Sequence, residues 1–442
     1  MANSFEARTL KNKKLYIFLE KHSPYRSNFK HKWNVNLLAL VAFYYRSDLK
    51  EIKEEIRIEN QKIKAVPGIL SAFSLQDILG HYQPTNLYPN PWSLNTGIQM
   101  KLNVWGNQNA KSKLIIRKWK MLWIQLEYKL WKIRESISTD LLKTFFYKKE
   151  LQILNRENNI FHLINFESQN MIFDNRYRLS EKIQQEKFFI KNEVVQEKLQ
   201  LCVDQLGKVL AIPESEILKM HFKYNRDYSK PLNPAILFPF KQMQMYALTQ
   251  RFDILEAAQQ FNEVQDELQI AIDEQYPAIH IAPGYLWDAQ GDKWLFGLGL
   301  SLPFLNHAHS RIMEMQFKRK QTAEKLMALQ EKIISNLKET WNRYQYAYQI
   351  WKKSKNIFNF EKKRYRIFQK FKKGGKAFQL AKLNYQLKYF KYQLYENQKL
   401  YALNQALLKL ERVLQIPIFK SSKSLWNKEV ESFMVSWRTN EN

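Results

Sequence analysis

Residues that could bind a metal or attack a substrate are few in this chain of 442 residues. His307-Ala308-His309 offers two imidazoles, but no carboxylate or further histidine stands close to them in the sequence. Zinc sites need three or four protein ligands, so His307 and His309 are weak candidates and we predict no metal site. Cys202, the single cysteine, lies in a helical pattern between two apolar residues, which favours a buried inert thiol.

Sequence patterns of catalysis and nucleotide binding are also missing. Gly374-Gly375 has neither the Lys-Ser/Thr pair nor the preceding strand of a phosphate-binding loop. No serine elbow and no recognisable pair of catalytic carboxylates occurs. The sequence therefore predicts a protein that is not an enzyme and that uses no cofactor.

The composition and the net charge indicate the general class of protein. Gly and Pro number only 11 and 13, and 45% of residues are hydrophobic, which excludes a disordered chain. The net charge is +28, but the basic residues are spread from end to end, as on the solvated faces of long helices, so we expect no nucleic-acid partner. No apolar run reaches eighteen residues, and the N-terminal segment shows no secretory signal.

Two segments alternate strictly between apolar and small or polar residues, namely 92–102 and 293–302. Period-two alternation predicts extended strands with one apolar face. A membrane-spanning sheet would place this face against lipid, whereas in the simpler alternative it anchors a sheet core. The predicted lipid-facing positions are Trp92, Leu94, Ile98, Met100, Leu102, Trp294, Phe296, Leu298, Leu300 and Leu302.

The two halves of the chain resemble each other at four landmarks in the same order. Arg46 matches Arg251, Trp92 matches Trp294, 159–161 matches 356–358, and 205–213 matches 409–417. Such a long period indicates two copies of a domain-sized unit. We expect an N-terminal extension (1–33), a first repeat (34–213), a linker (214–239), a second repeat (240–417) and a C-terminal tail (418–442).

Each repeat is expected to contain a helix, a strand pair and a long helical hairpin, which gives a mainly α fold with a small β part. The strand pairs are predicted at about 67–103, with a first arm at 67–76, and at about 277–304. The helical hairpins are predicted at 107–206 and 305–416, where Gly and Pro are rare and apolar residues recur at threes and fours. Their turns are placed near 174–180, with Ser180 capping the returning helix, and near 372–376.

This arrangement resembles the TolC-type outer-membrane efflux protein family over about residues 34–417. The most specific passage is 277–314, which contains Pro283-Gly284-Tyr285 and the strand end Leu302 to Asn306. The resemblance also includes Arg251 to Leu255, at the predicted start of a helix. Within the family, this passage is most similar to the outer-membrane component of cobalt, zinc and cadmium efflux systems.

The resemblance implies a homotrimer in the outer membrane of a Gram-negative bacterium. Each chain would give four strands to a twelve-stranded barrel, continued by a helical periplasmic tunnel that works with a periplasmic adaptor and an inner-membrane pump. The turns of the two helical hairpins would then meet the adaptor and form the tunnel entrance. The predicted residues are Arg178, Leu179, Ser180, Lys372, Lys373 and Gly374.

Two features depart from the family pattern. Family members are exported, yet neither a signal peptide nor a lipidated N-terminal cysteine is visible here. The chain is also strongly basic, whereas a conduit for cations would carry acidic rings. The alternative from another class is a soluble basic coiled-coil protein that binds nucleic acid or scaffolds other chains, with aromatic residues such as Tyr344 and Trp351 among its basic ones.

Overall fold

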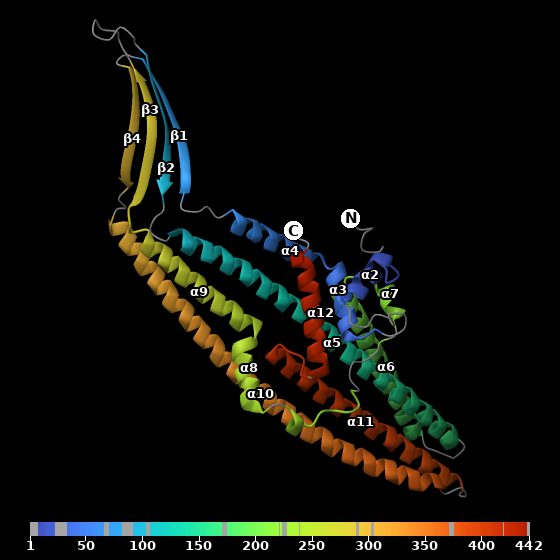
Figure 1. Cartoon of the computed structure of the whole chain (residues 1–442). Coiled ribbons are helices and arrows are strands. Elements are labelled where there is room, and N and C mark those ends of the chain that lie inside the picture. The colour runs from blue at the N-terminus through green and yellow to red at the C-terminus, as the bar shows by residue number, and fades with distance from the viewer. Residues whose placement is uncertain are drawn as a thin grey trace. The chain divides into compact units, whose positions relative to one another are not determined.

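The computed structural model describes most of the chain as a mainly helical fold with one small antiparallel sheet. In the order of the chain, α3–α4–β1–β2–α5–α6 is followed by α8–α9–β3–β4–α10–α11, and α2 and α12 flank the two series (Figure 1). The residues described are 8–22, 33–65, 70–81, 92–102, 107–169, 175–220, 222, 228–237, 239–288, 291–301, 305–370, 375–418 and 420–439.

The described residues fall into two compact units. The sheet unit is formed by Glu51–Leu126 and Phe252–Glu331. The helical unit is formed by Met1–Lys50, Glu127–Arg251 and Lys332–Asn442. The long helices α5 (Asn107–Gln169, 63 residues) and α10 (Leu305–Lys370, 66 residues) each contribute to both.

The four strands form one sheet in the order β1-β2-β3-β4, with antiparallel neighbours throughout (Figure 1). β2 (Trp92–Leu102) and β4 (Gly291–Ser301) are the two alternating segments. β1 (Leu70–His81) and β3 (Ala278–Asp288) are their hairpin partners. Gly291, with φ 104°, allows the chain to enter β4 in a conformation that a Cβ would strain.

The predicted first arm at 67–76 was wrong at its end, because β1 continues to His81. Asp77 and Gly80 interrupt the sequence pattern, but Asp77 pairs with Thr96 and Gly80 with Ser93 in the ladder with β2. A backbone ladder supplies its hydrogen bonds whatever the side chain, so a strand can pass through residues of low strand propensity.

Helices in the sheet unit pack through a small apolar cluster and several ion pairs. α9 (Phe252–Asp273) contacts α10 through Leu268, Ala271 and Ile312. Arg117 of α5 pairs with Asp266 of α9, and Lys318 of α10 pairs with Glu267 at 2.6 Å. These contacts hold α5, α9 and α10 together next to the ends of the strands.

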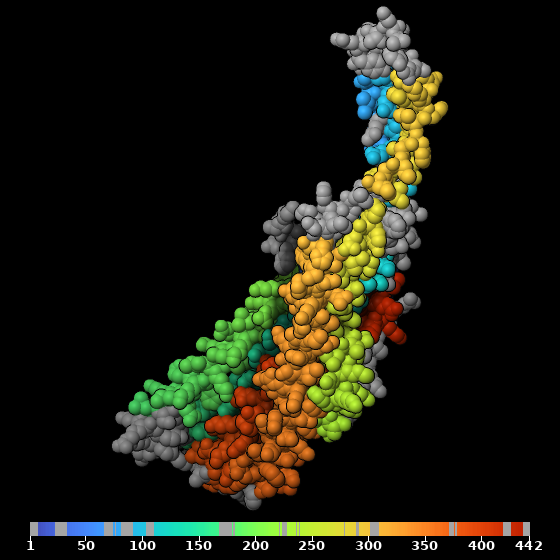
Figure 2. Space-filling view, turned by 90° about the vertical axis from the view of Figure 1, so that its left-hand side faces the viewer, coloured from blue at the N-terminus to red at the C-terminus, as the bar shows by residue number. Residues whose placement is uncertain are grey.

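The helical unit has a core formed by the distal parts of the long helices. Residues of α5, α6 (Asn175–Leu210) and α11 (Lys376–Leu414) form one buried cluster that includes Ile153, Leu154, Val195, Phe390 and Leu394. α10 and α11 lie side by side (Figures 1 and 2), and the Trp351 indole of α10 donates a hydrogen bond to Glu396 of α11 at 3.0 Å. Cys202 is buried, and burial raises the pKa of its thiol to about 11.

The opening helix of each series breaks at an arginine. α3 (Val35–Tyr45) and α4 (Ser47–Lys64) are separated by Arg46, while α8 (Phe240–Gln250) and α9 are separated by Arg251. Both arginines adopt extended backbone and donate through Nη1 to a carbonyl near the end of a returning helix, that of Val209 or Val413. The guanidinium thus satisfies a helix-terminal carbonyl that lacks a partner within its own helix.

The regions expected to be extension, linker and tail contain further helices. They are α2 (Lys13–His22), α7 (Glu214–Leu218), the short 3-10 helix η1 (Pro234–Ile236) and α12 (Lys420–Thr439). α2 packs against α3 and α12, and ten of the eleven residues of α3 are buried. None of the described helices combines the length and the hydropathy of a membrane-crossing segment.

Candidate membrane-facing sheet and hairpin ends

The register of the sheet collects most of the apolar residues of the four strands on one side. Leu79 lies opposite Leu94, Leu94 opposite Trp287, and Ile281 opposite both Met100 and Leu298. Directly opposed residues of antiparallel strands point to the same face. We call this side the apolar face. Its members are Leu75, Leu79, Trp92, Leu94, Ile98, Met100, Leu102, Ile279, Ile281, Tyr285, Trp287, Trp294, Phe296, Leu298 and Leu300.

Many side chains of the apolar face are strongly exposed, those on the outer strands β1 and β4 most of all. On β4, Trp294 is 86% exposed and Phe296 73%, and on β1 Leu75 and Leu79 are each 68% exposed. A continuous exposed apolar surface of this kind marks a surface that another apolar phase covers. The predicted positions on β2 and β4 thus lie together, except that Leu302 is outside the described residues.

The opposite side carries mostly small and polar residues, with Ile78, Leu286 and Leu295 among them. Ser93, Asn95, Gln99 and Lys101 of β2 alternate with the apolar positions. Gly97 and Gly284 face each other, and a Cβ on Gly97 would lie 3.3 Å from the Pro283 carbonyl oxygen and 3.4 Å from Gly284 Cα. The two glycines therefore permit a close approach of β2 and β3.

Polar residues interrupt the apolar face at Asp77 and Thr96 and, near the β3–β4 turn, at Asp292; the alternating pattern did not predict these positions. Thr96 donates a hydrogen bond to the carboxylate of Asp77 from the paired position on the next strand. Near the β3–β4 turn, the Tyr285 hydroxyl donates to Asp292 at 2.7 Å, and its ring lies 5.4 Å from that of Trp294. The aromatic contact is of the kind found where a sheet meets the edge of a bilayer.

At the first helical hairpin, the predicted turn at 174–180 was placed too late. α6 begins at Asn175, so Arg178, Leu179 and Ser180 lie in its first two turns and Ser180 does not cap it. Local Asn and Ser propensities suggested a turn, but the helix is favoured by packing farther along α6, where Val195 is in the core. The side chain of Leu179 is 62% exposed.

At the second helical hairpin, α10 ends at Lys370 and α11 begins at Lys376. Lys372, Lys373 and Gly374 lie outside the described residues. Next to them, stacked rings join the two helices, with Phe368 3.9 Å from Tyr385 and Tyr365 5.1 Å from Tyr389. These stacks fix α10 and α11 relative to each other close to the turn.

The histidine pair lies at the start of α10. His307 and His309 are the third and fifth residues of this helix, and His309 is exposed. Within the described residues, no group of three or more His, Cys, Asp or Glu side chains could hold a metal ion.

A buried charged cluster joins α12 to the trunk of the helical unit. Arg134 of α5 is 5% exposed, and its guanidinium carbon lies 5.6 Å from the ring of Trp131 and 5.3 Å from that of Trp426. Burial lowers the pKa of Arg134, whereas the negative charges of Glu411 on α11 and Glu429 on α12 raise it. Glu411 also accepts a hydrogen bond from the Ile418 backbone N–H at 3.2 Å.

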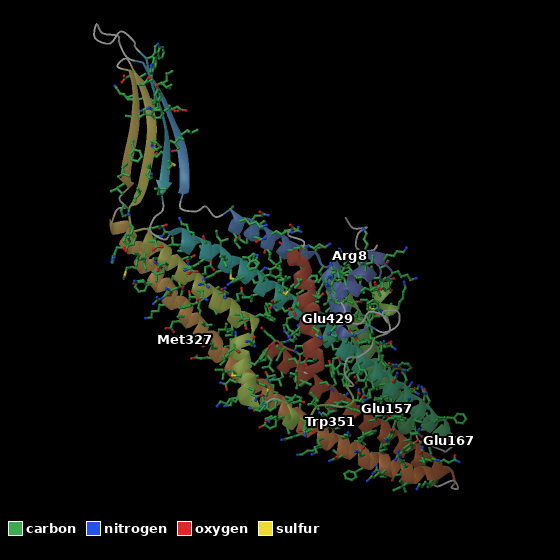
Figure 3. The ribbon with its side chains drawn as sticks, in the orientation of Figure 1. Arg8, Glu157, Glu167, Met327, Trp351 and Glu429 are labelled. Carbon is green, nitrogen blue, oxygen red and sulfur yellow. The ribbon has the colours of Figure 1, made fainter. Side chains whose placement is uncertain are left out.

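Glu429, labelled on α12 in Figure 3, is the most strongly perturbed carboxyl of this cluster. It is 1% exposed, and burial raises its pKa to about 8 although Arg134 and Asn36 oppose the shift. One turn further along α12, His22 of α2 is buried against Phe433 and shares a hydrogen bond of 3.0 Å with Ser432. Burial and then Lys21 lower the pKa of His22 to about 4.

These two groups give the packing of α12 a defined pH dependence. The folded chain holds a proton on Glu429 that the unfolded chain loses between pH 4.5 and 8, so this stabilisation falls as pH rises. The unfolded chain protonates His22 between pH 6.5 and 4 while the folded chain does not, so this stabilisation falls as pH drops. We predict that the two contributions together are flat from pH 4.5 to 6.5 and decline on both sides.

Denaturant unfolding of the full chain in detergent, followed by circular dichroism across pH, measures this profile. Each group contributes a slope of about 1.4 kcal/mol per pH unit within its window. Glu429→Gln should remove the decline above pH 6.5 and also the flat region, because His22 then acts alone and stability falls as pH drops from 6.5 to 4. An unaltered alkaline decline in that variant would contradict the assignment to Glu429.

The combination of an amphipathic four-stranded sheet with two very long helical hairpins is the fold of TolC-type outer-membrane channels. The structure matches that of the Campylobacter jejuni CmeC outer membrane channel with a TM-score of 0.65 and 11% identity, over 90% of this chain and 89% of that one. It matches CusC, described for its transmembrane channel formation, with a TM-score of 0.64 and 11% identity, over 86% and 91% of the chains. It matches the Vibrio cholerae outer membrane protein VceC with a TM-score of 0.63 and 12% identity, over 86% of this chain and 96% of that one.

No protein-family model matches the sequence, and no curated protein does. The likeness therefore concerns the fold.

Proposed function

We propose that this protein is a passive outer-membrane channel subunit of a tripartite efflux system in a Gram-negative bacterium. It would assemble as a homotrimer, with four strands per chain in a twelve-stranded barrel and with the long helices lining a periplasmic tunnel. The observation that carries the proposal is the apolar face, which extends across all four strands and is interrupted by the Asp77–Thr96 pair and by Asp292 near the β3–β4 turn.

The sheet also supports the oligomer. In the described sheet, β1 and β4 each pair with a single neighbour, so both edges present backbone groups for another strand. Unpaired backbone amides cost several kcal/mol each in a bilayer, so an open four-stranded sheet could not stand alone there. Joining β1 of one copy to β4 of the next closes a ring and removes every edge.

The small and polar side of the sheet suits a water-filled lumen. Gln99 and Lys101 would face it, together with the glycines of β3 and β4. Porin-type barrels show the same division, with apolar residues outward and polar residues inward. The protein would thus supply a passage and no catalytic group.

For the cargo, we propose metal cations as the first class to test, with drug-like compounds second. The support is the resemblance of residues 277–314 to outer-membrane components of cobalt, zinc and cadmium efflux systems. The partners would be an inner-membrane pump and a periplasmic adaptor. We propose that the adaptor contacts the ends of the two hairpins, that is, Arg178, Leu179 and Ser180 at the start of α6 and Lys372, Lys373 and Gly374 between α10 and α11.

The test is to express the chain with a bacterial signal peptide in a Gram-negative host and to fractionate the membranes. We expect a detergent-stable trimer in the outer-membrane fraction and discrete conductance steps when the trimer is added to a planar bilayer. A chain that remains outside the membrane fractions and binds nucleic acid with a steep salt dependence would instead support the basic coiled-coil alternative.

A further inference from the structure

The two helical hairpins differ sharply in charge at their turns. We compare equal windows of 34 residues, each running from the last nine residues of the outgoing helix to the first twenty of the returning one. The window 161–194 contains five Lys or Arg and five Asp or Glu residues, whereas the window 362–395 contains eleven Lys or Arg and no Asp or Glu. Eleven of the 28 net positive charges are therefore concentrated in 34 of 442 residues.

This concentration is a local property of one hairpin. If lysine simply solvated the long helices, the two equivalent ends would carry similar charge. The described basic side chains at the second hairpin are also accessible: Lys363, Arg366, Lys370, Lys388 and Lys391 are all exposed. Exposed Phe360 (69%) and Ile367 (57%) lie among them on α10.

The same region is held in one conformation by its aromatic stacks. Arg364 lies over the Tyr385 ring at 4.9 Å and pairs with Glu361 at 2.8 Å, next to the Phe368–Tyr385 contact. A surface that is already ordered loses little entropy on binding. A rigid basic surface with exposed apolar side chains is suited to docking another macromolecule.

We propose that this surface, the exposed basic residues from Lys363 to Lys391 with Phe360 and Ile367, docks an acidic polypeptide. The proposal rests on the proposed function, in which the hairpin turns meet an adaptor, and it specifies the chemistry of that partner. The adaptor segment would carry Asp and Glu residues along a helix that lies beside α10 and α11, and the first hairpin would contribute little charge.

The distance over which the basic surface extends along α11 favours a polypeptide over a lipid surface as the partner. Lys388 and Lys391 are the thirteenth and sixteenth residues of α11, which places them about 18–22 Å along the helix at its usual rise. A membrane touching the turn would act over a Debye length of about 8 Å. A partner helix lying along the hairpin reaches all of these charges.

The experiment uses the purified full-length protein in detergent, and its probe is a fluorescent, glutamate-rich helical peptide. The test variant is K363E/R366E/K370E/K391E. The matched control, K325E/K332E/K338E/K352E, reverses the charge of four exposed lysines elsewhere on α10. It therefore changes the net charge by the same amount as the test variant. We expect at least a tenfold loss of peptide affinity in the test variant and less than a threefold loss in the control, since exposed ion pairs contribute about two- to fivefold each.

Photo-crosslinking locates the contact. A benzoylphenylalanine at Ile367 should capture the peptide, whereas one at Phe166, which is 66% exposed at the equivalent position of the first hairpin, should not. Equal losses in both charge variants, or equal capture from both positions, would overturn the proposal. Binding to phosphatidylglycerol vesicles without binding to the peptide would overturn it in favour of a lipid surface.

Conductance separates this proposal from the proposed function. Both charge variants should form channels as the unmodified protein does, because neither alters the strands. An unmodified protein that binds the peptide at this hairpin but conducts no ions would refute the channel and leave the docking surface standing. A protein that conducts ions but binds the peptide no better at the basic hairpin than elsewhere would refute the docking surface and leave the channel standing.

Discussion

Replacing Arg134 by methionine should lower the free energy of unfolding of the helical unit by about 3–5 kcal/mol at neutral pH. The guanidinium is buried between two tryptophan rings and interacts with the charges of Glu411 and Glu429. Its removal leaves Glu411 buried without the neighbouring positive charge, and removing one partner of a buried ionic cluster is strongly destabilising. Denaturant unfolding of the full chain in detergent measures the loss.

Two further variants identify the cause of this loss. Arg134→Lys retains the positive charge but not the planar contact with Trp131 and Trp426, so we expect an intermediate effect. Glu429→Gln at pH 6.5 should stabilise the unit by up to about 2–3 kcal/mol, because the folded chain then no longer has to hold a proton that the unfolded chain has lost. An Arg134→Met variant that loses no stability would show that the cluster does not hold α12.

An arginine at Leu298 should prevent stable insertion of the strands into the outer membrane. Leu298 is 69% exposed on the apolar face, opposite Ile281 on β3. On the lipid side of a barrel, an arginine near the bilayer midplane costs about 2–4 kcal/mol, and a trimer would incur this cost in each chain. The yield of detergent-stable trimer from outer membranes is the measurement.

The matched control for this change is Gln99→Arg on the opposite side of the sheet. Gln99 alternates with the apolar positions of β2 beside Lys101, so an arginine there would extend into the lumen and leave the trimer intact. Equal yields from the two variants would mean that the apolar face does not contact lipid. A reduced yield from Gln99→Arg alone would mean that the Gln99 side contacts lipid and the apolar face lines the lumen.

Much of the architecture was predicted from periodicity. β2 has the predicted bounds 92–102, and β4 differs from the predicted segment 293–302 by two residues at one end and one at the other. The rarity of Gly and Pro anticipated α5, α6, α10 and α11, and Gly374-Gly375 indicated the interruption after Lys370. Periodicity succeeds for these elements because each is long and the pattern repeats many times.

Shorter or locally mixed segments were predicted less well. The end of β1 and the start of α6 were misplaced, because Asp77, Gly80, Asn175 and Ser180 have local preferences that pairing or packing overrides. The helices α2 and α12 were classed as extension and tail, since the burial of Leu15, Leu19 and Phe433 depends on their contact with each other and with α3.

The sequence by itself determined the kinds of element, their lengths and the presence of an apolar face on individual strands, because these depend on spacing along the chain. Only the tertiary structure decided that the apolar residues of four strands form one surface, since this depends on register between segments about two hundred residues apart. It likewise brought together Arg134, Glu411 and Glu429, which come from three helices. Charges so distant in sequence carry no local signal of their proximity, and their pKa values are set by burial that only packing creates.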